Sequence, residues 1–211
     1  MKEVVAQAHD IGDLYGLFGR RAPEAVVVAR AAVPQPQRDL LDHEDHMTVT
    51  LEAHHGDLVD VEVLDRVAYD GRYARRILLR RATGPGGARS PRPAAVVMFG
   101  IVLIDFRFTT EAARHEVLGE ATPLGHVLIR HSRLRRISTH CLLEIEPDRE
   151  MRRHFGLGDG VDGKASPVHG RLATIFCDGR PAVELLEVVP PGPAAQARST
   201  GNEMSSSMLR T

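Results

Sequence analysis

The run of residues 96–104 most constrains what this chain can fold into, because it contains no polar side chain. It follows a stretch rich in Gly and Pro, and Asp105 comes directly after it. A continuous apolar run of this length, rich in β-branched residues, is typical of a buried strand at the centre of a sheet. We therefore predict a buried central strand over residues 94–106.

Several other segments alternate between apolar and polar residues, as strands do. Two of the intervening turns are readable, at His55-Gly56-Asp57 and at Asp178-Gly179, and the second is a strong hairpin signal. Short connections of this kind join antiparallel neighbours. The sequence therefore predicts an α+β fold in which a single antiparallel β-sheet is covered by helices. The predicted strands are residues 47–54, 58–64, 72–80, 94–106, 138–145, 170–177 and 181–189.

The chain has 211 residues, of which 43% are hydrophobic, and this is enough for one sizeable core. We predict a helical or irregular N-terminal segment over residues 1–37, one folded domain over residues 38–190 and a disordered tail over residues 191–211. Helices are expected within residues 38–46, after Thr109 or Thr110, from Thr122 onward, and within residues 146–167.

The charges are balanced, with 27 basic and 28 acidic residues, so the chain lacks the basic field that nucleic-acid binding requires. No stretch is long and apolar enough to predict a membrane span. Cys141 and Cys177 lie far apart without metal-type spacing, and we interpret them as reduced core residues, while the sequence leaves a bridge between them open. These features favour a cytoplasmic protein, a monomer or small homo-oligomer, that binds neither nucleic acid nor membrane.

The stretch Thr122-Pro123-Leu124-Gly125 carries the signals of a helix start. We expect Thr122 to cap this helix and Pro123 to be its first residue, since proline has no N–H to leave unpaired. The first amides of a helix, here those of Leu124 and Gly125, lack carbonyl partners within it and attract carboxylates or phosphates. The alternative is an ordinary capped helix that packs on the core.

Arg75 falls on the more apolar face of the predicted strand 72–80, together with Tyr73. A guanidinium on the inner face of a sheet must be paired, because an unpaired buried charge is too costly. Its partner is either an acidic side chain of the protein or an anionic ligand, and the strand alone does not decide between them. Arg76 and Arg80 belong to the other face and are expected to be solvated.

The last predicted strand has Glu187 on one apolar face and Glu184 on the other. A carboxylate among apolar neighbours is expected to be functional or paired. The alternation does not say which of the two glutamates this is.

Histidines and acidic residues gather between residues 43 and 55, and imidazole and carboxylate are ligands of zinc and iron. No pair of them has the i, i+4 spacing that makes a motif such as His-Glu-x-x-His specific. We therefore favour surface histidines over a metal site. The residues concerned are His43, His46, His54 and His55.

Four landmarks follow one another along residues 38–190: Glu44-Asp45-His46-Met47-Thr48, then Arg72-Tyr73-Ala74-Arg75-Arg76-Ile77-Leu78-Leu79, then Thr122-Pro123-Leu124-Gly125, then Gly179-Arg180-Pro181 with the glutamate strand. In this order they resemble the bacterial chorismate pyruvate-lyases (chorismate lyases), most closely the branch that supplies 4-hydroxybenzoate for phenolic lipids or secondary metabolites. The resemblance implies an antiparallel sheet backed by helices, with an enclosed ligand cavity under two helical flaps.

The resemblance also implies conversion of chorismate to 4-hydroxybenzoate and pyruvate without a metal or coenzyme. The carboxylate-binding arginine of the family falls on Arg75. Its helix-start amides fall on Leu124 and Gly125, and its flap methionine falls on Met47. These last three are therefore expected to bind substrate.

The pocket glutamate of the family falls on Glu187 when the strand is counted back from Pro190. The family usually has Thr before that Glu, where this chain has Leu186. Counted instead from the glycine turn, the register can slip by one, so Glu184 stays as the alternative.

With these assignments, Arg75 and Glu187 are the expected catalytic residues. Arg75 orients the substrate and stabilises developing negative charge, while Glu187 binds the 4-hydroxyl group and acts as acid or base. The competing interpretation is a non-catalytic, effector-sensing protein of the same fold that binds an aromatic carboxylate, as domains of some bacterial transcription regulators do. Residues 1–37 are too short for the winged-helix DNA-binding module of such regulators, which favours the lyase.

Overall fold

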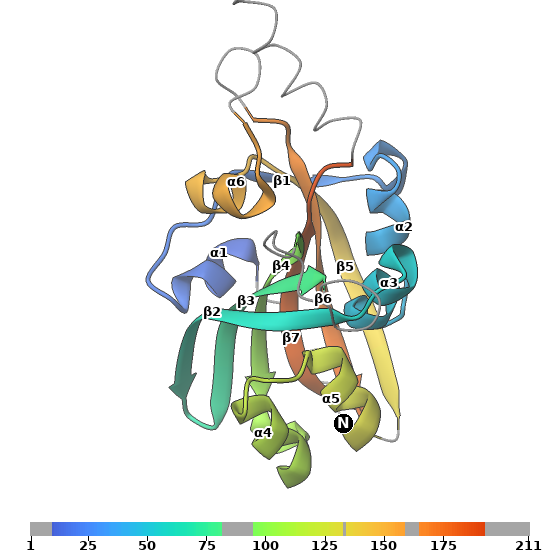
Figure 1. The fold of residues 1–211 in the computed structure, drawn as a ribbon. Coiled ribbons are helices and arrows are strands. Elements are labelled where there is room, and N and C mark those ends of the chain that lie inside the picture. Colours follow the sequence, from blue (N-terminus) through green and yellow to red (C-terminus); the bar gives the residue numbers. More distant parts are fainter. Residues whose placement is uncertain (1–9, 82–94, 133, 159–164, 193–211) are drawn as a thin grey trace, which may run out of the picture.

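The computed structural model describes residues 10–81, 95–132, 134–158 and 165–192, so most of the predicted tail 191–211 lies outside the described residues. Within these residues, seven strands form one antiparallel sheet in the order β1-β5-β6-β7-β4-β3-β2, and six α-helices pack around it (Figure 1). The predicted α+β fold with a single antiparallel sheet is confirmed. The strands are β1 Ala25–Val28, β2 Val59–Tyr69, β3 Arg72–Arg81, β4 Val96–Asp105, β5 Arg135–Ile145, β6 Val168–Cys177 and β7 Arg180–Val189.

The predicted central strand is β4, which pairs with β3 on one side and β7 on the other. Nearly every residue of β4 is buried, because helices cover both faces of the sheet. The hairpin of β6 and β7 turns at Asp178-Gly179 as predicted, and Gly179 has a φ of 79°, which glycine adopts without strain.

One face of the sheet, called here the α1 face, packs against α1 (Ile11–Gly16) and α6 (Arg149–Phe155). The opposite face, called the α5 face, packs against α2 (Gln37–Leu41), α3 (Met47–His55), α4 (Glu111–Leu118) and α5 (Leu124–His131) (Figure 1). Strand residues therefore alternate between two different cores. On the α1 face these are Ala74, Leu78, Phe99, Ile101, Leu186 and Val188, and on the α5 face Tyr73, Ile77, Val102, Leu185 and Val189.

The prediction of a strand over residues 47–54 is wrong, because this segment is helix α3. Its buried residues Met47, Thr48 and Leu51 have helical spacing, which the strand interpretation read as alternation. Gly56 ends the helix with a φ of 65° and donates its N–H to the carbonyl of Glu52.

The first 37 residues, predicted as a helical or irregular segment, contribute to the sheet and to the core from residue 10 onward. Leu14 and Tyr15 of α1 are buried in the α1 face, and β1 pairs with β5 as an edge strand. Strand β1 is short and its central residues are exposed, so its sequence shows no alternation that would reveal it. Among the described helices, none has the length and apolar character needed to cross a membrane.

Candidate functional site

Arg75 lies in the middle of β3 opposite Val102, and its side chain belongs to the α5 face, as the strand pattern predicts. It is 0% exposed. None of its three guanidinium nitrogens has a hydrogen-bond partner among the described residues. Burial lowers the pKa of Arg75, and the nearby Tyr73 and Glu120 oppose this effect. Because a guanidinium stays protonated in proteins, the site presents a buried positive charge that an anion can pair.

The prediction that Arg76, the next residue, is solvated is wrong. Its side chain lies on the α1 face and is 1% exposed. It forms an ion pair with Glu150 of α6 and lies 3.9 Å from Asp65, with its guanidinium 5.7 Å from the centre of the Phe99 ring. The prediction fails because helices cover this face too. Arg80, nearer the end of β3, is partly exposed and paired with Glu62.

Glu187 lies on the same face of the sheet as Arg75 and is 7% exposed. Glu187 of β7 pairs with Gly100 of β4, and Gly100 pairs with Ile77 of β3, which is two residues after Arg75. Standard sheet spacings place the Cα atoms of Glu187 and Arg75 roughly 12 Å apart. A Cβ atom on Gly100 would lie 3.0 Å from Cε of Met98 and 3.3 Å from Cγ1 of Ile77, so these two side chains cover the sheet beside Glu187.

The partner of Glu187 is Arg171 of β6, which the sequence analysis did not identify. The Nε of Arg171 donates to Oε2 of Glu187 at 2.7 Å. Counting pairs outward from the hairpin turn would place Arg171 opposite Leu186. An irregularity between Ile175 and Phe176 shifts the register by one, so that Arg171 faces Glu187 instead.

Glu184, the alternative pocket glutamate, points to the opposite face of the sheet. Its cross-strand neighbours are Leu103 on β4 and Thr174 on β6. Since side chains alternate along β7, Glu184 cannot share a pocket with Arg75, whereas Glu187 can.

Helix α5 begins at Leu124, one residue later than the predicted start at Pro123, and both Leu124 and Gly125 are buried. Thr122 does not cap it. The N-cap residue is Pro123, with no side-chain bond to the helix, and Thr122 instead hydrogen-bonds the Glu116 carboxylate. The first amides of α5 thus have no side-chain cap, as an anion-binding helix end requires.

The tips of α3 and α5 touch at Gly125. A Cβ atom on Gly125 would lie 2.7 Å from Oγ1 and 2.9 Å from Cβ of Thr48. Glycine is therefore needed for this close approach. His126 and Glu52 add a bond between the same two helices, with Nε2 and Oε2 3.0 Å apart.

Met47 is 3% exposed and packs with Ile77 and Met98 on the α5 face. His46, expected at the surface, is also buried, and its Nε2 has no partner among the described residues. Burial, followed by the charges of Arg135 and Arg171, lowers the pKa of His46 to about 4, so its imidazole is neutral at pH 7. Within the described ranges, no group of three or more His, Cys, Asp or Glu is placed to hold a metal ion.

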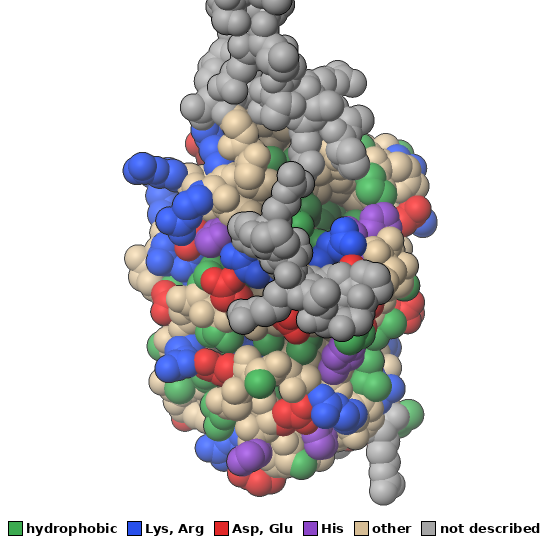
Figure 2. Space-filling model, viewed as in Figure 1, with side chains coloured by type: hydrophobic (Ala, Val, Ile, Leu, Met, Phe, Trp, Pro, Cys, Tyr) green, Lys and Arg blue, Asp and Glu red, His purple; other side chains and the backbone are tan. Residues whose placement is uncertain are grey.

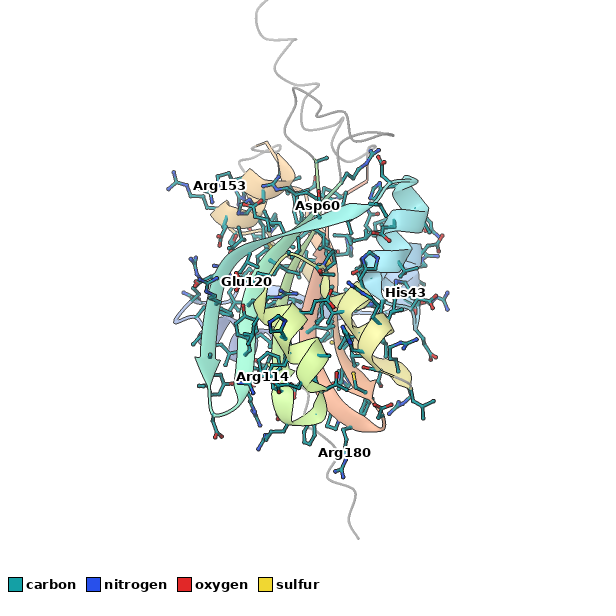
Figure 3. All side chains as sticks on the ribbon, turned by 60° about the horizontal axis from the view of Figure 1, so that its bottom comes forward. His43, Asp60, Arg114, Glu120, Arg153 and Arg180 are labelled. Carbon is teal, nitrogen blue, oxygen red and sulfur yellow. The ribbon has the colours of Figure 1, made fainter. Side chains whose placement is uncertain are left out.

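A surface cavity of about 410 Å³ lies near Arg75, where Tyr73 and Glu120 form part of its lining. The Tyr73 hydroxyl donates to Glu120, which lies between α4 and α5 in the chain and also pairs with Arg66 of β2. Glu120 is labelled in Figure 3. No described cavity lining includes both Arg75 and Glu187, so the enclosed chamber that would join them stays a prediction. The face in Figure 2 carries acidic and basic side chains mixed together.

Comparisons with known proteins leave the family open. No family model matches the chain. No curated protein matches it either. Among solved structures, the chain is similar to the PhnF C-terminal domain, with 12% sequence identity and a TM-score of 0.35. The alignment covers 64% of this chain and 84% of that domain. A superposition this loose carries no argument about activity, so function must be argued from the side chains.

Proposed function

We propose that this protein is a chorismate lyase, which eliminates pyruvate from chorismate to give 4-hydroxybenzoate. The observation that carries the proposal is the fully buried Arg75, whose guanidinium nitrogens have no partner among the described residues. An unpaired buried charge is costly for folding, and it is retained where an anionic ligand completes it. Glu187 on the same face supplies the second polar group.

The charges of the site suit a small aromatic or pre-aromatic carboxylate. Arg171 and Glu187 form a neutral pair, so Arg75 supplies the net positive charge on this face. Arginine can bind a carboxylate through two parallel hydrogen bonds. The second carboxylate of chorismate is assigned to the amides of Leu124 and Gly125, which offer partial positive charge without another cation.

The reaction needs few groups from the protein. The C3–O ether bond breaks, the C4 hydrogen leaves as a proton, and its electron pair makes the ring aromatic. The departing enolpyruvate takes up a proton to become pyruvate, so atoms and electrons balance. In this scheme Glu187 accepts a hydrogen bond from the 4-hydroxyl group and serves as acid or base, and Arg75 stabilises the negative charge that develops.

The test is to incubate the purified protein with chorismate and to quantify 4-hydroxybenzoate and pyruvate. The proposal predicts equal amounts of the two products, formed faster than in a protein-free control. The matched variants are Arg75→Met, expected to be inactive, and Arg76→Met, expected to retain activity per folded molecule. Binding of 4-hydroxybenzoate without turnover would identify the non-catalytic, effector-sensing alternative, and absence of both would refute the ligand class.

A further inference from the structure

Arg171 is a buried cation on the α5 face for which the reaction scheme gives no role. It lies in the middle of β6 and is 0% exposed. Its Nε donates to Oε2 of Glu187 at 2.7 Å, and Glu187 is itself buried. A buried ion pair is weak evidence for a stabilising role, because apolar residues of similar volume are often at least as stable. The pair therefore calls for a functional reason.

The same guanidinium holds the segment that precedes α3. Its Nη1 donates to the carbonyl of Leu41 at 3.2 Å and to that of His43 at 2.9 Å, and its Nη2 reaches the carbonyl of Asp45 at 3.4 Å. Leu41 is the last residue of α2, where carbonyls lack donors within the helix. One side chain thus connects the pocket glutamate to three carbonyls of residues 41–45.

His43 helps to fix the conformation of this segment, and Figure 3 labels it. Its Nε2 lies 2.8 Å from the carbonyl of Leu40, and its Nδ1 accepts the N–H of Asp45 at 3.1 Å. Both contacts fit a neutral ring protonated on Nε2. Burial, followed by the charge of Arg171, lowers the pKa of His43, which agrees with this form.

The held segment leads directly to the helix tips. Met47 begins α3, and Thr48 in its first turn packs against Gly125 at the start of α5. A continuous set of contacts therefore joins Glu187, through Arg171 and residues 41–48, to the amides that we assign to a substrate carboxylate. Displacing Arg171 would move both ends of the site.

We propose that Arg171 is a positioning residue that aims Glu187 at the hydroxyl group of the ligand, so that preference for a para-hydroxylated aromatic carboxylate depends on it. The ligand class rests on the proposed function. Arg171 occupies Oε2 of Glu187, and the other oxygen is assigned to the ligand hydroxyl. A purely structural role would weaken the binding of all aromatic carboxylates alike.

The test compares the dissociation constants of 4-hydroxybenzoate and benzoate by calorimetry, in the wild type and in Arg171→Lys. Lysine keeps the charge but lacks the planar fork that bonds the carboxylate and the carbonyls together. The wild type should prefer 4-hydroxybenzoate by roughly tenfold to a hundredfold, as for a hydrogen bond to an ionised group. In Arg171→Lys this ratio should fall towards one, and a folded variant with an unchanged ratio overturns the proposal.

Two variants serve as controls. Arg76→Lys changes an equally buried arginine on the α1 face and should leave the ratio as it is in the wild type. The double variant Arg171→Lys, Glu187→Gln should have the same ratio as Glu187→Gln alone, because Arg171 acts through Glu187. A further fall in the double variant would contradict this route.

The outcomes separate this inference from the lyase activity. If the wild type makes no product from chorismate, the proposed reaction is refuted. If Arg171→Lys nevertheless loses the preference for 4-hydroxybenzoate over benzoate, the role of Arg171 is supported. If neither aromatic binds to the wild type, the proposal is overturned together with the ligand class. If Arg171→Lys does not fold, amide hydrogen exchange of Glu187→Ala provides the decision. If Glu187 holds residues 41–45 through Arg171, the backbone amides of residues 42–47 should exchange about threefold faster in Glu187→Ala than in the wild type. Unchanged exchange there overturns the proposal.

Discussion

Arg75 and Arg76 are consecutive residues of β3 with nearly equal burial and opposite surroundings. Arg76 faces α6, where it pairs with Glu150 and lies against the Phe99 ring. Arg75 faces α5 and has no hydrogen-bond partner for any guanidinium nitrogen among the described residues. The same side chain in the same strand thus has its charge paired by a carboxylate of the protein on one face, although its Nε has no partner among the described residues, and is left for a ligand on the other.

This difference suits a structural role for the α1 face and a ligand-binding role for the α5 face. The α1 face combines an apolar cluster with Arg76, whose charge is paired within the protein by Glu150. The α5 face buries Arg75, the Arg171–Glu187 pair and the neutral His46, all of which cost folding free energy relative to apolar side chains. Among these groups, the Arg75 guanidinium and Nε2 of His46 have no partner among the described residues, and buried polar groups left unpaired are characteristic of functional sites.

The largest expected effect separates activity from stability at Arg75. Arg75→Met should reduce turnover of chorismate and affinity for 4-hydroxybenzoate by about a hundredfold or more, because the carboxylate loses its charged, bidentate partner. Its free energy of unfolding should stay equal or rise by about 1–2 kcal/mol, since an unpaired buried charge is removed. Steady-state kinetics and urea unfolding measure the two effects. If Arg75→Met unfolds more easily than the wild type and keeps its turnover, Arg75 is a structural residue and does not bind the substrate.

His46 extends the comparison to pH. Its pKa in the folded protein is about 4, whereas an unfolded histidine titrates near 6.5. Between these values the unfolded chain binds more protons, so the free energy of unfolding falls as pH falls from about 6.5 to about 4. The share from His46 is about 3 kcal/mol.

Urea unfolding at a series of pH values checks this expectation. In His46→Asn the total loss of unfolding free energy between pH 6.5 and pH 4 should be smaller by about 3 kcal/mol. The contributions of the other histidines with lowered pKa should remain, namely those of His43, His55, His154 and His169. Parallel curves for the wild type and the variant would show that His46 titrates normally in the folded protein.

Arg76 provides the converse of the Arg75 experiment. Arg76→Met should lower the free energy of unfolding by about 2 kcal/mol, because it leaves the partly buried Glu150 with a weaker set of partners. The loss is limited because Arg20 also lies 3.3 Å from Glu150. Turnover per folded molecule should be unchanged. Thermal and urea unfolding, combined with active-site titration, test whether the arginine of the α1 face is structural.

The sequence predicted the fold where one pattern was unambiguous. The uninterrupted apolar run became the central strand β4, and Asp178-Gly179 became the turn between β6 and β7. It failed for α3, where Met47, Thr48 and Leu51 fit a short strand as well as a helix until the partner elements are known. It missed β1 because its exposed centre shows no alternation.

The site was predictable in part for the same reason. Alternation placed Arg75 and Glu187 on apolar faces, and the structure puts both on the α5 face and Glu184 on the other. The pairing of Glu187 with Arg171 depends on a register shift in the β6–β7 hairpin, which no local pattern reveals. The burial of Arg76 depends on α6, which lies far from it in the sequence.

The smallest predicted effect concerns Gly125, where the tips of α3 and α5 meet. A Cβ on Gly125 would lie within 3 Å of both Oγ1 and Cβ of Thr48, so Gly125→Ala must push α5 away from α3. We expect a loss of about 1 kcal/mol in the free energy of unfolding and about a tenfold rise in the dissociation constant for 4-hydroxybenzoate. Gly16→Ala at the end of α1 is the matched control, because no atom lies within 4 Å of its Cβ position. That change should be neutral or stabilise by up to about 1 kcal/mol and leave binding unaltered. Equal effects of the two substitutions on binding would mean that the α3–α5 contact does not shape the site.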